Sequence, residues 1–165
     1  MATPRRVAVL LVGGVLLAGI AAWLRPDQAG SRALTLPEQL AGLPRVAAGE
    51  QAMAQTQRLH GDAIPITQAA FALYGTSAQV TLWVATAAGE LEAEAMVEAM
   101  REAIAGGDSA FTPLAPRAID GTTVYPLRGM GKEHLYFSSG PLVVWLAAAP
   151  AIAEAAGQAV VEAYR

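Results

Sequence analysis

Residues 117–147 read RAIDGTTVYPLRGMGKEHLYFSSGPLVVWLA, and this stretch decides the fold. It contains four short runs rich in residues that favour strands, and turn residues separate the runs. The first two runs, 117–119 and 122–127, flank Asp120 and Gly121, a dipeptide typical of a two-residue hairpin. Because turns this tight join only antiparallel strands, the pattern predicts an antiparallel sheet.

The second half of the stretch repeats the pattern. Residues 133–138 and 142–147 are strand-like runs, and the turn residues 139–141 (Ser-Gly-Pro) separate them. The glycines at 129 and 131 predict a further turn ahead of residue 133. We therefore expect a second hairpin in the same sheet.

Two more strands are expected upstream, at 66–74 and 79–86, joined by the turn-rich residues 75–78. Residues 90–104 predict an amphipathic helix, because apolar side chains recur at helical spacing and glutamates occupy the opposite face. Residues 48–60 and 150–164 predict two further helices.

These elements predict one α+β domain over residues 36–165. Its mostly antiparallel sheet would have about six strands, with about three helices packed on it. A split ferredoxin-like arrangement is the closest simple alternative.

The N-terminus has a different character. The uncharged run 7–24 follows Arg5 and Arg6 and would form about 27 Å of helix, close to the roughly 30 Å of a bilayer core. It predicts a transmembrane signal anchor at 7–24, which places an N-terminal transmembrane helix ahead of the α+β domain. A cleaved signal peptide with a secreted domain is the alternative. Residues 25–35 predict a short linker.

Charge predicts the orientation of the chain. Arg5 and Arg6 place residues 1–6 in the cytoplasm and the domain outside it, in a single-pass membrane protein. Beyond Arg25 the chain has eight basic and 14 acidic residues, a net charge of −6, which argues against nucleic acid as a partner. The chain has no cysteine, which excludes disulfides and thiol nucleophiles.

Known catalytic motifs are not matched. The Gly131-Lys132 pair lacks the rest of a phosphate-binding loop, because Pro126 stands at its first glycine position and Glu133 at its hydroxyl position. Ser77 lies in a sequence that resembles a hydrolase nucleophile elbow but lacks the second glycine.

Metal binding and cofactors are also unsupported by motif. His60 and His134 are far apart in the chain, and neither has a second ligand at a metal-binding spacing. We predict no metal, no cofactor and no enzymatic activity.

A sheet face is the remaining candidate site. In the strand 133–138, His134 and Tyr136 point to one side, while Leu135 and Phe137 point to the other side and belong to the core. Aromatic residues on other strands can share the first face. The candidate ligand-binding residues are His134, Tyr136, Trp83, Trp145 and Tyr125. A helix packed on this face is the simpler alternative.

Four segments carry a resemblance to a class of proteins: residues 111–114 (FTPL), 129–131 (GMG), 134–136 (HLY) and 142–147 (LVVWLA). In these segments the chain resembles uncharacterised bacterial single-pass exported proteins, over most of its length after residue 35. The resemblance implies a location and no known activity.

Three functions follow as hypotheses. The first is a non-catalytic, membrane-anchored domain that binds an envelope protein partner or assists envelope assembly. The second is a receptor that binds a small ligand on the face around His134 and Tyr136. The third is a hydrolase that uses Ser77, with His134 as its base.

Overall fold

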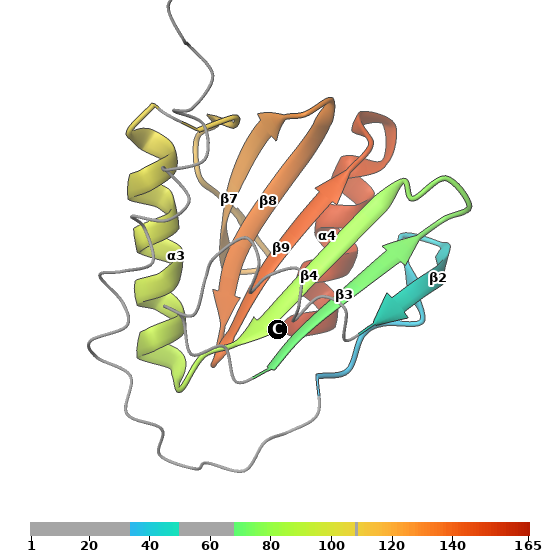
Figure 1. Cartoon of the computed structure of the whole chain (residues 1–165), viewed down its shortest axis with the longest axis horizontal. Coiled ribbons are helices and arrows are strands. Elements are labelled where there is room, and N and C mark those ends of the chain that lie inside the picture. The colour runs from blue at the N-terminus through green and yellow to red at the C-terminus, as the bar shows by residue number, and fades with distance from the viewer. Residues whose placement is uncertain (1–33, 50–67, 108) are drawn as a thin grey trace, which may run out of the picture.

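The structure is a computed structural model that describes residues 34–49, 68–107 and 109–165 (Figure 1). Its elements, in chain order, are β1 (Gln39–Leu40), β2 (Leu43–Gly49), β3 (Gln68–Tyr74), β4 (Val80–Thr86), α3 (Glu90–Ala105), β5 (Thr112–Pro113), β6 (Arg117–Ile119), β7 (Thr122–Gly129), β8 (Lys132–Ser139), β9 (Leu142–Ala148), a 3₁₀ turn (Pro150–Ile152) and α4 (Ala153–Tyr164).

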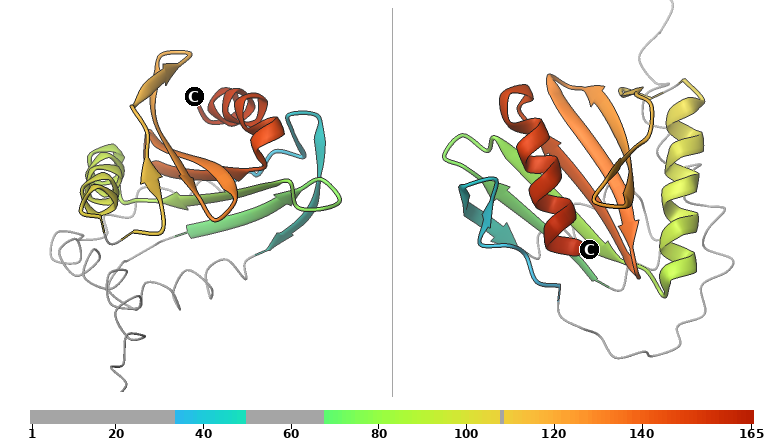
Figure 2. Two further views of the ribbon diagram at one scale, coloured as in Figure 1. Left: turned by 90° about the horizontal axis from the view of Figure 1, so that it is seen from above. Right: turned by 180° about the vertical axis from the view of Figure 1, so that it is seen from behind.

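The strands of the described residues form one sheet with the order β1-β2-β3-β4-β9-β8-β7-β5. Strand β6 pairs with the first part of β7, and β5 pairs with its last part. Every neighbouring pair is antiparallel. The sheet curls into a half-barrel, seen end-on in the left view of Figure 2.

The two predicted hairpins of residues 117–147 are confirmed by the pairing of β6 with β7 and of β8 with β9, and a third hairpin joins β7 to β8. Asp120 and Gly121 have φ values of 47° and 83°, and Met130 and Gly131 have φ values of 54° and 73°. Two consecutive residues with positive φ are the mark of a type I′ turn, whose twist matches that of the flanking strands. These turns set the register in which Ile119 pairs with Thr122 and Gly129 with Lys132.

The two helices cover opposite faces of the sheet. α4 lies in the hollow of the half-barrel and α3 lies on its outer side (Figures 1 and 2). The hollow contains the larger core, which includes Leu82, Phe137, Val144 and Val160, all at most 1 % exposed. A smaller core lies under α3, between its apolar stripe and the outer face of β7, β8 and β9.

The predicted counts of about six strands and three helices were wrong. The described residues contain nine strands and two α-helices, although all six predicted strands occur near their expected bounds. The additional strands are β1, β2 and β5. Two of them, β1 and β5, are only two residues long, and prolines and glycines surround them. Such short segments count as strands only because they pair with a neighbouring strand, and the local sequence does not predict that pairing.

The predicted helix at 48–60 was wrong at its start. Ala48 and Gly49 are the last residues of β2 and pair with Ala72 and Phe71 of β3. The rest of that prediction lies outside the described residues.

The fold prediction also included an N-terminal transmembrane helix, and the described fold does not contain one. None of the helices in 34–49, 68–107 and 109–165 is long and apolar enough to cross a membrane. The segment 7–24 itself lies outside the described residues.

Candidate functional site

An aromatic row crosses five strands on the outer face of the sheet. Direct cross-strand partners build it: Phe71 on β3 pairs with Trp83 on β4, and Trp83 pairs with Trp145 on β9. Trp145 pairs in turn with Tyr136 on β8, and Tyr136 with Tyr125 on β7. We call these five residues the aromatic row. The structure thus places all four aromatic residues of the predicted site on one face, together with His134, which lies two residues before Tyr136 on β8.

Three of the four neighbouring pairs in the row have their rings at packing distance. Tyr136 stacks on Trp145 with ring centroids 5.3 Å apart, and Tyr125 stacks on Tyr136 at the same distance. Phe71 lies 5.5 Å from Trp83 in a tilted arrangement. Aromatic pairs of this kind add about 0.5–1.5 kcal/mol beyond the area that they bury.

Helix α3 covers the part of this face on β7, β8 and β9. Its residues Ala93, Val97 and Ile104 are buried against Tyr136 and its neighbours. Tyr136 is 1 % exposed, and burial raises the pKa of its hydroxyl to about 12. Trp83 and Trp145 are half-buried. The predicted site residues therefore share one face of the sheet, and three of them, Tyr125, Tyr136 and Trp145, pack under α3.

His134 is 8 % exposed, and both of its ring nitrogens are engaged. Nε2 lies 3.1 Å from the carbonyl oxygen of Gly129, which can only accept a hydrogen bond. Nδ1 lies 3.2 Å from Nε1 of Trp145, which can only donate one. The neutral tautomer with its proton on Nε2 satisfies both contacts. Burial accordingly lowers the pKa of His134.

Phe111, in the segment that follows α3, packs against both His134 and Trp145. Its ring contacts His134 edge-on at a centroid distance of 4.9 Å and Trp145 at 5.3 Å. The backbone N–H of Phe111 donates to Oγ of Ser109 across 3.1 Å, which holds the approach to β5. Phe111, His134 and Trp145 are called the aromatic cluster below.

Phe111 packs directly against the backbone of Gly129. A Cβ atom at this position would lie 2.6 Å from Cδ1 of Phe111 and 2.7 Å from the carbonyl oxygen of Ala110. Only glycine leaves room for that approach. The glycine that the sequence places in a turn thus also makes the packing of the aromatic cluster possible.

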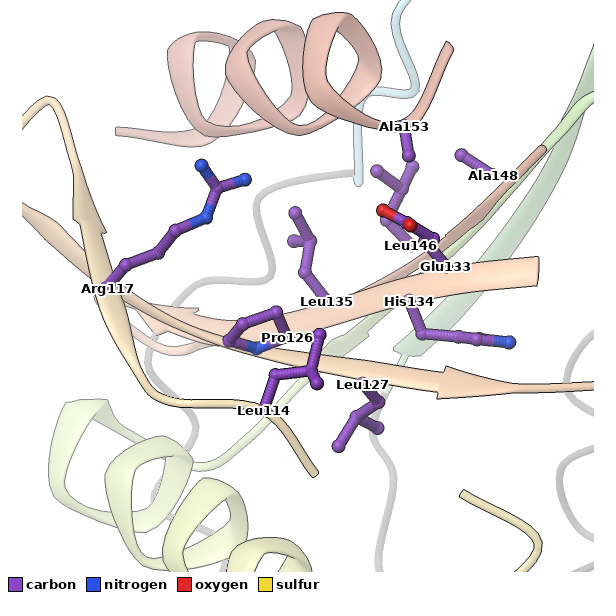
Figure 3. Close-up of a pocket in the computed structure, with 10 residues that line it drawn as sticks. All are labelled: Leu114, Arg117, Pro126, Leu127, Glu133, His134, Leu135, Leu146, Ala148 and Ala153. Atoms are coloured by element: carbon purple, nitrogen blue, oxygen red, sulfur yellow. The ribbon is translucent and has the colours of Figure 1, made fainter. Parts of the chain in front are cut away.

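A small cavity lies on the other face, between α4 and strands β7, β8 and β9 (Figure 3). Its volume is about 30 Å³, room for about one water molecule and far below that of a ligand pocket. Its lining residues are Leu114, Arg117, Pro126, Leu127, Glu133, His134, Leu135, Leu146, Ala148 and Ala153.

The charged groups at this cavity already have partners. Arg117 binds both carboxylate oxygens of Glu154 at 3.1 and 2.7 Å, and Glu133 lies 3.6 Å from Arg128. Figure 3 shows the Leu127 side chain on the opposite side of the sheet from Arg117 and Ala153.

The other chemical candidates are not assembled into a site. Ser77 is exposed in the loop between β3 and β4, and both ring nitrogens of His134 contact other groups. Within the described part of the chain, no three His, Cys, Asp or Glu side chains gather as metal ligands. His60 lies outside the described residues.

Comparisons of the chain with protein-family models, with curated proteins and with solved structures find no match.

Sequence reasoning missed two members of this face. Phe71 lies in a predicted strand, and the alternation of that strand together with the β3–β4 hairpin register was the signal that could have placed it beside Trp83. Phe111 carries no such signal, because it lies in a proline-rich segment outside every predicted strand and helix.

Proposed function

We propose that residues 36–165 form a non-catalytic protein-interaction domain, exported and held at the cell membrane by residues 7–24. We propose further that it contacts an envelope protein through the turn between β7 and β8. The net charge of −6 beyond Arg25 supports a protein partner over nucleic acid.

The observation that carries this proposal is the backbone conformation and exposure of Met130. Its side chain is 79 % exposed, and its φ of 54° is a left-handed conformation that costs a non-glycine residue about 1–2 kcal/mol. The left-handed backbone at this large apolar residue lowers the stability of the fold, and strained backbone positions of this kind cluster at sites of contact and switching.

Both ends of this turn are held in place. The ring of His134 donates to the carbonyl oxygen of Gly129, directly before Met130. Nζ of Lys132, the only lysine of the chain, donates to the carbonyl oxygen of Ala78 across 3.1 Å and ties the turn to the β3–β4 loop. The Met130 side chain is therefore presented from a rigid base, which lowers the entropy lost on binding a partner.

The turn also lies far from the point where the chain enters the domain. The hydroxyl of Tyr164, the last residue of α4, donates to the carbonyl oxygen of Thr35, and the backbone oxygen of Tyr164 accepts from Ser139. Ser139 ends β8 and Lys132 begins it, so the strand separates the two regions by roughly 24 Å at about 3.4 Å per residue. A membrane tether ahead of Thr35 would leave Met130 at the free end.

The packing of α3 and Phe111 over His134 and Tyr136 supports this proposal over a small-ligand receptor. A ligand on that face would have to displace groups that are already in contact. The turn next to His134, in contrast, exposes the side chain of Met130.

Site-specific photo-crosslinking in intact cells tests the proposal. A photoreactive phenylalanine analogue replaces Met130 in the full-length chain, and a second chain carries it in place of Leu91. Leu91 is the matched control, because it is 77 % exposed on α3, away from the turn. We expect one protein adduct of reproducible mass from position 130 and none from position 91.

Equal adducts from both positions, or none from position 130, would contradict the proposed contact. Location is measured separately, with enzyme reporters fused after residue 165. Reporters that are active only in the cytoplasm would overturn the proposed export and leave the contact itself to the crosslinking result.

A further inference from the structure

The hydrogen bonds of His134 can be satisfied in only one protonation state. Its Nδ1 must accept from the indole N–H of Trp145, while its Nε2 must donate to the oxygen of Gly129. A protonated imidazole has two donors and no acceptor. On protonation, the N–H of His134 and the N–H of Trp145 would point at each other across 3.2 Å.

We infer that the aromatic cluster is an acid-sensitive contact, in which protonation of His134 breaks its hydrogen bond with Trp145 and loosens Phe111 from the sheet. The inference concerns the fold and stands independently of the proposed function.

Movement of either ring would be transmitted to its neighbours. Trp145 stacks on Tyr136 with an interplanar angle of 13°, and Phe111 packs edge-on against both His134 and Trp145. Neither ring can turn away from the other without disturbing one of these contacts. Phe111 leads directly into β5, so this short edge strand would be the first element to separate from β7.

The charged groups around His134 do not stabilise its protonated form. On its own strand and face lie Lys132, whose positive charge further lowers the pKa of His134, and Tyr136. β7 contributes Tyr125 to this face, and α3 contributes the Glu98–Arg101 ion pair and Glu102 near the tyrosines. β9 and β5 contain no titratable side chain. Within the described residues, no acidic group is positioned to stabilise a protonated His134.

The test uses the full-length chain in detergent micelles, with its tryptophans replaced by 5-fluorotryptophan. Fluorine NMR gives one resonance for each of Trp23, Trp83 and Trp145, assigned with single Trp→Phe variants. Between about pH 7.5 and 4.5 we expect the Trp145 resonance to shift reversibly with a midpoint below 6.5, the ordinary pKa of histidine.

His134→Gln is the key variant, since an amide can donate to Gly129 and accept from Trp145 at every pH in this range. We expect its Trp145 resonance to lose the pH-dependent shift. A wild-type resonance that does not move with pH, or an equal shift in His134→Gln, would overturn the inference.

A second variant covers the case in which His134→Gln does not fold. Trp145→Phe removes the donor that keeps Nδ1 unprotonated. The imidazole C–H resonance of His134 should then titrate at a higher pH than in the wild-type chain. An unchanged midpoint would show that the indole does not control His134, and would also overturn the inference.

Discussion

The indole N–H of Trp145 donates a hydrogen bond to Nδ1 of His134 across 3.2 Å, between neighbouring strands β9 and β8. This contact joins the aromatic row to the aromatic cluster, because Trp145 belongs to both. It also gives the buried histidine a structural role, since its lone pair is used inside the fold. Four predictions follow from this arrangement and from the turns around it.

Stability should fall in mild acid. Burial lowers the pKa of His134 in the folded chain, whereas the unfolded chain titrates near the ordinary value of about 6.5. Below that pH the unfolded chain binds more protons, so the free energy of unfolding decreases until the folded pKa is passed. Urea denaturation at a series of pH values measures this decrease.

His134→Gln is the control for this prediction, because it should flatten the decrease between about pH 7 and 5. A free energy of unfolding that stays constant over this range in the wild-type chain would contradict the prediction.

Stability should also fall in strong alkali. Burial raises the pKa of Tyr74 and of Tyr136 to about 12, above the value of about 10 for an unfolded tyrosine. The neutral hydroxyls of these two tyrosines contribute fully to the free energy of unfolding below pH 10, and this contribution is lost as the pH rises towards 12. Tyrosinate absorbance and far-ultraviolet circular dichroism, recorded together, should change in the same pH range. Ionisation of the buried tyrosines without loss of structure would count against the predicted fall in stability.

Gly129→Ala should destabilise the fold. The added methyl group would overlap the Phe111 ring and the backbone oxygen of Ala110, and the latter cannot move freely. We expect a loss of about 1–3 kcal/mol, measured by urea denaturation, with increased solvent exposure of Trp145. Gly106→Ala is the matched control, because Gly106 has helical φ and ψ and its nearest contact would be 3.3 Å. Equal effects of the two changes would show that Phe111 does not depend on Gly129.

Met130→Asn should stabilise the fold and weaken partner binding. Asparagine tolerates the left-handed conformation at this position, and Asn-Gly is a preferred type I′ turn. We expect a gain of about 1 kcal/mol in the free energy of unfolding, together with loss of the proposed partner in co-purification. Met130→Leu keeps the strain and the apolar surface and should change neither quantity much. A loss of stability in Met130→Asn would show that the turn is not strained.

The sequence by itself determined the local elements of this protein. The six strands between residues 66 and 147 and the helices near 90–104 and 150–164 were predictable, because alternation, helical spacing and turn dipeptides are properties of neighbouring residues. It also determined that His134 and Tyr136 share one face of β8, since side chains alternate along a strand.

Only the tertiary structure decided what covers that face, and it added Phe71 to the row and Phe111 to the cluster. The segment that bears Phe111 lies outside the predicted hairpin of His134 and Trp145, and no local pattern relates it to them. Their contact depends on the order of strands in the sheet, on the side to which α3 returns and on the missing side chain of Gly129. The short strands β1 and β5 exist for the same reason, because a two-residue strand is defined by the edge with which it pairs.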